Sequence, residues 1–316
     1  MYKIVYTILI VFFISCADER KYQGPVNRIV CLSSNQDKEI VQQAFEKAFA
    51  DTIFTPQSEQ KYDVVYKDFI DFNDYKYSSN LIIASIANPT DSTADMYANR
   101  LTASMDSVHS IFTTENALTD NQLLVCAFYG DSLGFSDGIH NNREWIRQSF
   151  DRQINRNIIY KYNQREQNDS IKSAINSNFE LDLIVHNDYT VLADGPGYIW
   201  IGRGMPYRWL MIQDVSEGPY EFSDISSNIN SIEGIEGMVL SDSFRYKSER
   251  IIDSMEAQFF RGVYEYNETG GPFVSYLFSY NNRSILVSSF VNNPGYDKLP
   301  MLIQQEAIIE NIKIME

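Results

Sequence analysis

The sequence has few cysteines, few histidines and fewer positive than negative charges. Three cysteines and three histidines occur in 316 residues, with no Cys-x-x-Cys pair. We therefore expect neither a zinc site nor a disulfide scaffold, and no cofactor. Lys and Arg number 26 against 42 Asp and Glu, which gives a net charge of −16. Because nucleic acids and anionic lipid surfaces repel an acidic chain, we do not expect nucleic acid as a partner.

Long apolar runs are also missing, with one short exception at the start. Lys3 precedes an apolar run at residues 4–14, which is too short for a membrane-spanning helix and typical of a signal peptide. The run ends at Ser15-Cys16, and this junction resembles the lipobox of bacterial lipoproteins. The resemblance implies a signal peptide at 1–15, acylation (palmitate) of Cys16 and a tether at 16–27. An ordinary secretory signal with a chance cysteine is the alternative.

The rest of the chain has the composition of a folded protein, with 44% hydrophobic and 22% charged residues. Cys31 and Cys126 both lie in apolar runs, and we interpret them as buried free thiols. A disulfide between them is the alternative in an oxidising envelope.

Hydrophobic periodicity predicts an α+β fold. We expect antiparallel sheets with helices packed on one face, in two similar subdomains at 28–160 and 161–316, because strand and helix signals repeat in similar order. The predicted strands are 29–32, 62–72, 81–87, 123–129, 179–185, 198–201, 209–212, 263–266 and a hairpin of 273–280 with 284–291. The first predicted helix follows Asn35 and includes residues 40–49, and the second spans 91–111. Further helices are predicted to begin near 142 and to lie around 171–175. The last predicted helix has Met301, Ile308 and Met315 on one stripe.

The catalytic candidate is Gly130-Asp131-Ser132-Leu133, which follows a predicted strand. It resembles the nucleophile block of the GDSL (SGNH) esterases, and Gly134-Phe-Ser136-Asp-Gly138 matches the Gly-x-Ser-x-Gly elbow. The esterase blocks Gly-x-Asn-Asp and Asp-x-x-His do not follow downstream, and a serine needs a positioned base. We therefore interpret this stretch as a strand-to-helix loop and name no catalytic residue.

A binding candidate lies between Gly197 and Trp209, where aromatic residues alternate with arginines and glycines. Such side chains can stack on sugar rings or clamp an anionic ligand. The simpler interpretation is two core strands joined by a glycine-rich turn, with solvated arginines. The candidate ligand contacts are Trp200, Arg203, Tyr207, Arg208 and Trp209.

Two further features are interpreted as structural. Gly270-Gly271-Pro272 marks a bend or bulge before a strand. Asp182 and Asp188 have no partner base or metal-ligand pattern, so we expect solvated carboxylates.

Five segments occur in an order that resembles a known family: Cys16 with its lipobox, Thr55-Pro-Gln-Ser-Glu59, Tyr198-Ile-Trp-Ile201, Gly270-Gly-Pro-Phe-Val-Ser-Tyr276 and Gln304-Gln-Glu-Ala-Ile308. Together they resemble an uncharacterised family of Bacteroidota envelope lipoproteins, classed as a domain of unknown function. The resemblance spans nearly the whole chain. It implies a lipid-anchored envelope protein with no established activity and no catalytic residues to carry over. Ala17-Asp18-Glu19 also resembles a surface-export signal of that phylum, which leaves surface-exposed and periplasm-facing orientations open.

From these features we expect an outer-membrane lipoprotein, attached through acyl chains on Cys16, with a non-enzymatic binding or envelope-accessory role. Its expected partner is another envelope protein. The alternatives are a serine hydrolase that uses Ser132 and a glycan-binding module that uses Trp200 and Trp209.

Overall fold

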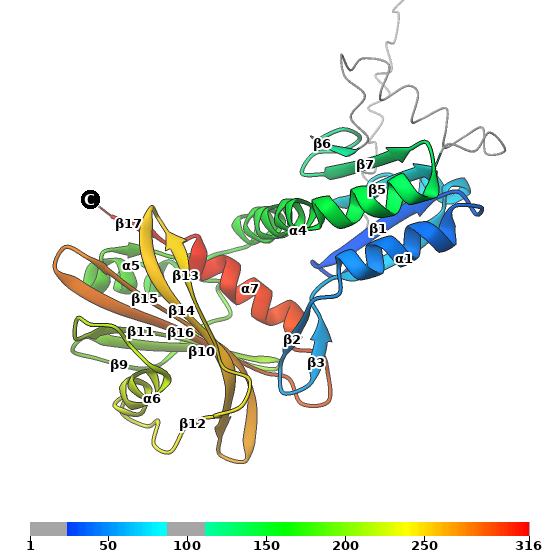
Figure 1. Cartoon of the computed structure of the whole chain (residues 1–316). Coiled ribbons are helices and arrows are strands. Elements are labelled where there is room, and N and C mark those ends of the chain that lie inside the picture. Colours follow the sequence, from blue (N-terminus) through cyan, green and yellow to red (C-terminus); the bar gives the residue numbers. More distant parts are fainter. Residues whose placement is uncertain (1–23, 87–110, 316) are drawn as a thin grey trace, which may run out of the picture.

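The computed structural model describes residues 24–86 and 111–315 (Figure 1). The expected signal peptide, Cys16 and nearly all of the helix expected at 91–111 lie outside these residues. The chain forms two lobes, each built on its own sheet, and the long helix α4 (Ser132–Asn163) runs from the first lobe to the second. Within the described residues, no helix is both long enough and apolar enough to cross a membrane.

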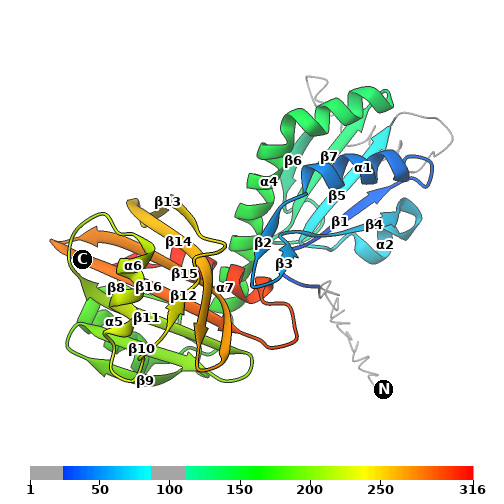
Figure 2. The same cartoon turned by 60° about the horizontal axis from the view of Figure 1, so that its bottom comes forward.

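The first lobe holds a five-stranded sheet in the order β4-β1-β5-β7-β6. Strands β4, β1, β5 and β7 are parallel and only β6 is antiparallel. Helices α1 and α4 cover one face of this sheet, and short helices at its edge cover part of the other (Figure 2). The elements are β1 (Arg28–Ser33), α1 (Lys38–Ala48), β2 (Thr52–Phe54), β3 (Ser58–Gln60), β4 (Asp63–Asp68), η1 (Phe69–Asp71), α2 (Phe72–Tyr75), β5 (Asn80–Ile86), β6 (Ile111–Glu115) and β7 (Leu123–Tyr129).

The second lobe holds an eight-stranded antiparallel sheet. Helix α6 covers one face, and α5 and α7 cover the other. The elements are α5 (Asp169–Phe179), β8 (Leu181–Asp182), β9 (Thr190–Gly195), β10 (Tyr198–Arg203), β11 (Tyr207–Val215), α6 (Phe222–Asn230), β12 (Val239–Leu240), β13 (Tyr246–Ile252), β14 (Met255–Tyr266), β15 (Thr269–Tyr280), β16 (Arg283–Asn292), α7 (Leu299–Glu310) and β17 (Lys313–Ile314).

The two lobes share one hydrophobic core. Buried side chains continue from α1 and the first sheet, along Ile154 and Ile158 of α4, to α7 and the second sheet. A second contact comes from the β2–β3 hairpin, where the carboxylate of Glu59 accepts hydrogen bonds from the backbone N–H groups of Lys298 and Leu299 at 2.9–3.1 Å. Glu59 thereby caps the N-terminus of α7, whose own N-cap residue Lys298 supplies no side-chain bond.

The predicted α+β class is confirmed, but two details of the prediction are wrong. The first sheet is mostly parallel, as is typical where the central strands β1, β5 and β7 are largely buried on both faces and the parallel strands are joined by long crossovers rather than hairpins. The two lobes are consequently not similar to each other. The boundary predicted between residues 160 and 161 lies in the last turn of α4, and the subdomain division itself stays a prediction.

Several element boundaries also differ from the prediction. Strand β4 ends at Asp68, because the Asp68 carboxylate accepts a hydrogen bond from Ile70 N–H and starts a helical turn. Helix α4 begins at Ser132 instead of near 142, and the strand expected at 179–185 is reduced to β8. The predicted β15–β16 hairpin is confirmed, with Asn281 and Asn282 both at positive φ as a tight two-residue turn requires.

The cysteines are free and buried in the described residues. Cys31 packs in the core between the first sheet and α1, whereas Cys126 packs on the opposite face. The alternative of a Cys31–Cys126 disulfide is therefore wrong, since the sheet itself separates the two thiols.

Candidate functional site

The five predicted ligand residues lie on the β10–β11 hairpin, but they point to different sides of it. Strand alternation places Trp200 and Trp209 on the face that α6 covers. Arg203 and Arg208 share the opposite face with core residues such as Ile201 and Leu210. Tyr207 stands at the hairpin tip and is 41% exposed. One small ligand therefore cannot contact all five.

The two tryptophans are half-buried parts of an aromatic cluster. Their rings meet edge to face, with centroids 6.0 Å apart, and Trp209 also contacts Tyr264 and Tyr266. Trp209 packs across Gly202, where a Cβ would lie 2.8 Å from the indole Cδ1. This packing accounts for the tryptophans as structural residues beside α6.

The two arginines are directly opposite each other in the antiparallel register. Like charges in directly opposed positions destabilise a sheet unless something compensates for their repulsion. Arg203 is compensated in part, because its Nη2 lies 2.7 Å from Asp188 Oδ2 and its guanidinium group lies 5.8 Å from the Tyr189 ring centroid. Its Nη1 is enclosed and has no hydrogen-bond partner among the described residues.

The positive charge of Arg208 is less well compensated than that of Arg203. Its side chain is only 9% exposed, and it makes no hydrogen bond or close ion pair with any residue that the structure describes. Its Nε is completely enclosed. Burial, together with repulsion from Arg203, lowers the pKa of Arg208 from its usual value, which shows that this environment disfavours the cation.

His186 adds a third polar side chain to this face. Its ring stacks on Tyr162, from the end of α4, with centroids 4.1 Å apart. Its Nε2 is enclosed and unpartnered within the described residues. Burial lowers the His186 pKa, and Arg165, Arg203 and Arg208 lower it further while Asp188 opposes them. The imidazole is therefore neutral at pH 7.

Buried hydrogen bonds hold the surroundings in place. Gln305 of α7 donates to the Tyr189 hydroxyl at 3.2 Å and accepts from Ser289 of β16 at 3.0 Å. Tyr162 donates to Gln304 at 2.7 Å. Burial raises the pKa of Tyr189 to about 12, so its hydroxyl stays protonated as a donor. Helices α4 and α7, the loop before β9 and the β10–β11 hairpin thus meet at one rigid polar cluster.

We call Arg203, Arg208 and His186, with Asp188 and Tyr189 beside them, the arginine site. The expectation of solvated arginines is wrong, because Arg208 is buried and the side chain of Arg203 is only 17% exposed. Asp188 is exposed, as expected, and pairs with Arg203. Sequence reasoning missed His186 and Tyr189. The symmetric placement of Arg203 and Arg208 about a four-residue turn was a usable signal for the arginine pair, whereas nothing local pointed to His186.

The predicted esterase stretch forms the start of a helix. Ser132 is the first residue of α4, and the Asp131 carboxylate caps the helix by accepting from Gly134 N–H at 2.8 Å. Ser136 donates to the Ser132 carbonyl, and His140 faces Arg143 at 3.3 Å. Within the described residues, neither serine hydroxyl is hydrogen-bonded to a base.

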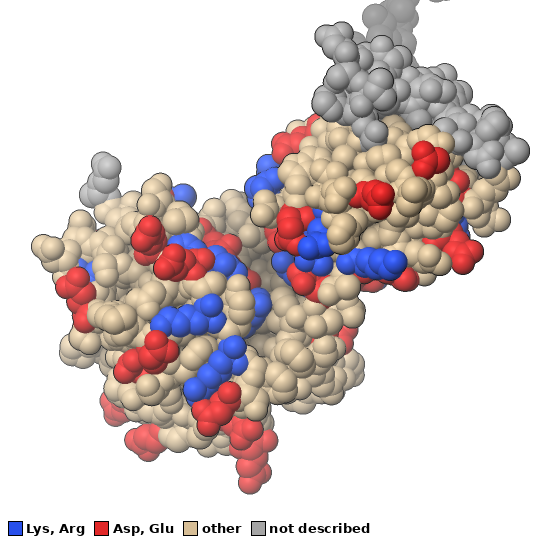
Figure 3. All heavy atoms as spheres, in the orientation of Figure 1, with Lys and Arg blue, Asp and Glu red and all other residues tan. Residues whose placement is uncertain are grey.

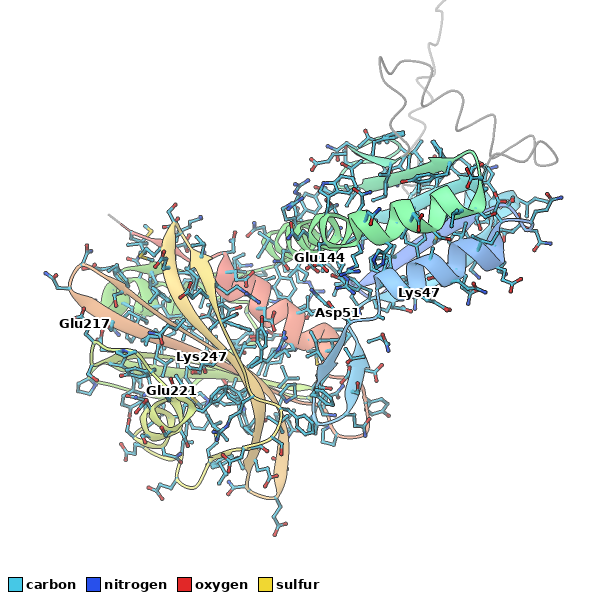
Figure 4. The ribbon with its side chains drawn as sticks, viewed as in Figure 1. Lys47, Asp51, Glu144, Glu217, Glu221 and Lys247 are labelled. Carbon is cyan, nitrogen blue, oxygen red and sulfur yellow. The ribbon has the colours of Figure 1, made fainter. Side chains whose placement is uncertain are left out.

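The outer surface of the first lobe holds a groove of about 640 Å³ between α1 and α4. Lys47, Asp51 and Glu144 lie around it (Figure 4), and Arg147 pairs with Glu144 at 3.4 Å and with Asp51 at 3.8 Å. Figure 3 shows acidic and basic side chains interspersed on the described part of this face of the molecule. Because opposite charges compensate each other in the groove, it points to no ligand of one charge.

The comparison with protein families matches the second lobe. Residues 167–311 match DUF4837, a domain of unknown function. The predicted resemblance to a domain of unknown function is confirmed for this segment, which includes β10, β15 and α7. No curated protein matches the sequence significantly.

Solved structures show only remote similarity. A protein from Bacteroides thetaiotaomicron VPI-5482 has 13% identity and a TM-score of 0.29, and the match covers 43% of this chain and 46% of that one. LpqN of Mycobacterium tuberculosis, described as involved in cell envelope biogenesis, has 14% identity and a TM-score of 0.28 over 43% of this chain and 83% of its own. The chain thus spans less than half of the first of these structures, and neither similarity carries a functional argument.

Proposed function

We propose that the protein is an acylated cell-envelope lipoprotein that binds an anionic ligand at the arginine site. The observation that carries the binding proposal is Arg208, a residue only 9% exposed, whose enclosed Nε has no hydrogen-bond partner and whose side chain makes no close ion pair with the described residues. Three enclosed nitrogens, from Arg203, Arg208 and His186, lack acceptors in the same cluster.

The loss of hydration at the buried arginines favours the binding of an anion. Removing a charge from water costs several kcal/mol unless hydrogen bonds and an opposite charge replace the lost hydration. Asp188 supplies one such charge but contacts Arg203, not Arg208. Buried polar groups in native proteins nearly always have partners, and an external acceptor accounts for the ones missing here. A bound anion supplies both the acceptors and the charge.

Thermal unfolding with added anions tests the proposal. We expect the wild-type midpoint to rise with anion concentration, by about 5 °C at a hundredfold excess over the Kd, which corresponds to about 2.7 kcal/mol. The Arg208→Met variant should show no such rise. Without anion it should be more stable than the wild type by about 1–3 kcal/mol, because an uncompensated charge has been removed.

Arg283 provides the matched control. It is also a strand arginine of the second sheet, but it is more exposed and makes a two-pronged pair with Asp214 at 2.9 Å. Arg283→Met should lose about 1 kcal/mol or less and keep the full response to anions. An Arg208→Met variant that responds to anions like the wild type would show that the site does not bind them.

The envelope part of the proposal is supported by the sequence at residues 1–16. Metabolic labelling with palmitate should label the wild type and leave Cys16→Ser unlabelled. Labelling of Cys16→Ser, or none in the wild type, contradicts acylation at this residue.

Orientation and partner are tested in living cells. Protease treatment of intact cells should degrade a surface-exposed protein and spare a periplasm-facing one. Cross-linking followed by purification through a C-terminal tag should recover one envelope protein in near-stoichiometric amount if the role includes a protein partner. Recovery of this chain alone would leave the anionic ligand as its binding activity.

A further inference from the structure

The charge of the arginine site specifies the charge of its ligand. The groups that act on His186 are the guanidinium groups of Arg165, Arg203 and Arg208 and the carboxylate of Asp188, while His186 is itself neutral. Within the site, Arg203 and Arg208 carry two positive charges against the one negative charge of Asp188, and the exposed Arg165 adds a third positive charge at its edge. Positive charge is therefore in excess. Arg165 lies over the Tyr162 ring at 5.5 Å and therefore belongs to the same cluster.

The unpartnered nitrogens of the site are a second observation. Arg208 Nε, Arg203 Nη1 and His186 Nε2 come from three separate backbone segments and are all enclosed without an acceptor in the described residues. A carboxylate has two oxygens in one plane, whereas a phosphate group offers three equivalent terminal oxygens in three directions. Guanidinium groups pair well with either anion, so charge and the number of acceptors decide between them.

We infer that the ligand of the arginine site is a dianionic phosphate group, bound by Arg203 and Arg208 with His186 as the third donor. This inference rests on the proposed anion binding and makes it specific. The phosphate group can belong to free phosphate, to a soluble phosphomonoester or to a lipid headgroup, which share this chemistry.

Calorimetric titration of the full chain at pH 7.5 tests the inference with inorganic phosphate, sulfate and acetate. Sulfate is a dianion with no proton to lose in this range, so it separates charge from protonation. We expect phosphate and sulfate to bind at least about tenfold more tightly than acetate. Acetate binding as tightly as sulfate would overturn the dianion inference while leaving anion binding intact. If none of the three binds, the proposed function itself fails.

The source of the phosphate is distinguished by two further probes, glycerol 3-phosphate and vesicles that contain phosphatidic acid. Tighter binding of glycerol 3-phosphate than of inorganic phosphate identifies a soluble phosphomonoester. Capture by phosphatidic acid vesicles that Arg208→Met abolishes identifies a headgroup. Inorganic phosphate as the tightest of the three identifies the free ion.

Two variants test the residue assignment. Arg203→Gln removes one of the two guanidinium charges of the site and should remove the preference for sulfate over acetate. His186→Phe keeps an aromatic ring to stack on Tyr162 but removes the donor, and should weaken phosphate binding about five- to tenfold. Circular dichroism spectra that match the wild type establish that both variants are folded. An unchanged preference in folded Arg203→Gln, or unchanged phosphate affinity in His186→Phe, contradicts the assignment.

Discussion

Glu310, at the end of α7, should make the stability of this protein fall as the pH rises. Its carboxylate accepts hydrogen bonds from Tyr276 of β15 at 3.0 Å and from Asn155 of α4 at 3.2 Å. Arg250 of β13 lies 3.7 Å away, and Glu306 and Asp151 add negative charge. Burial, reinforced by Glu306, raises the pKa of Glu310 to about 7.

The sign of the effect follows from proton linkage. The folded state holds the Glu310 proton more tightly than the unfolded chain, whose pKa is 4.5. The contribution of this group to stability is therefore full below the unfolded value and is lost as the pH rises through the folded one. A difference of about 2.5 pKa units corresponds to about 3 kcal/mol, which is lost between pH 4.5 and 8.

Urea unfolding of the full chain across this range, compared with Glu310→Gln, measures the effect. The glutamine keeps the shape and hydrogen-bonding capacity of the protonated acid and does not titrate. The stability difference, variant minus wild type, should therefore increase by about 3 kcal/mol from pH 4.5 to pH 8. The matched control is Glu249→Gln on β13, which makes the same substitution at an exposed carboxylate. A Glu310→Gln difference that is independent of pH would refute the reasoning.

Three other predictions concern the fold. Gly271→Ala should lower the free energy of unfolding in a urea titration by about 2 kcal/mol or more, because a Cβ would lie 1.9 Å from the Val291 carbonyl oxygen. The control is Gly130→Ala, where a Cβ would meet nothing within 4 Å and the free energy of unfolding should not change. Glu59→Ala should lower the stability by about 1–2 kcal/mol, because α7 loses its cap. Ser58→Ala, at the exposed neighbour, should leave the stability unchanged. Equal losses of stability in both variants would contradict the cap. Cys31 and Cys126 should resist alkylation in the native state, because burial raises both thiol pKa values, and rapid native labelling of either would disagree with the structure.

Part of this fold could be predicted from local sequence patterns. Alternation and the paired asparagines at 281 and 282 were sufficient for the β15–β16 hairpin, because register and turn are set by neighbouring residues. The direction of the first sheet was harder to predict. Its strands are apolar on both faces, which is itself typical of a parallel sheet, and the long connections between them were the second signal.

The family-like segments owe their pattern to structure. Glu59 caps α7, which carries Gln304 to Ile308, so two segments 240 residues apart form one contact. Gly271 lies inside β15 rather than before it. The position requires glycine, because Tyr264 and the Val291 carbonyl leave no room for a side chain. Rules for neighbouring residues in the sequence cannot predict these contacts, since each contact depends on which elements become neighbours in the fold.

The arginine site could not be predicted from local sequence rules either. Arg203 and Arg208 were candidates as residues of an aromatic loop, and their opposition follows from the hairpin register. Their surroundings include Tyr189 and the loop at His186, which lie far from the hairpin's own turn and which Gln305 of α7 helps to hold. The tryptophans appeared equally suited to binding in the sequence, but alternation places them on the other face.

The most direct test is nitrogen NMR of the arginine side chains during a phosphate titration. The Arg208 Nε–H resonance is identified by its loss in Arg208→Met, and the Arg283 resonance serves as the internal reference. We expect a saturable shift of the Arg208 resonance, with the Arg283 resonance unmoved. An Arg208 resonance that stays in place at millimolar phosphate would contradict anion binding at this site.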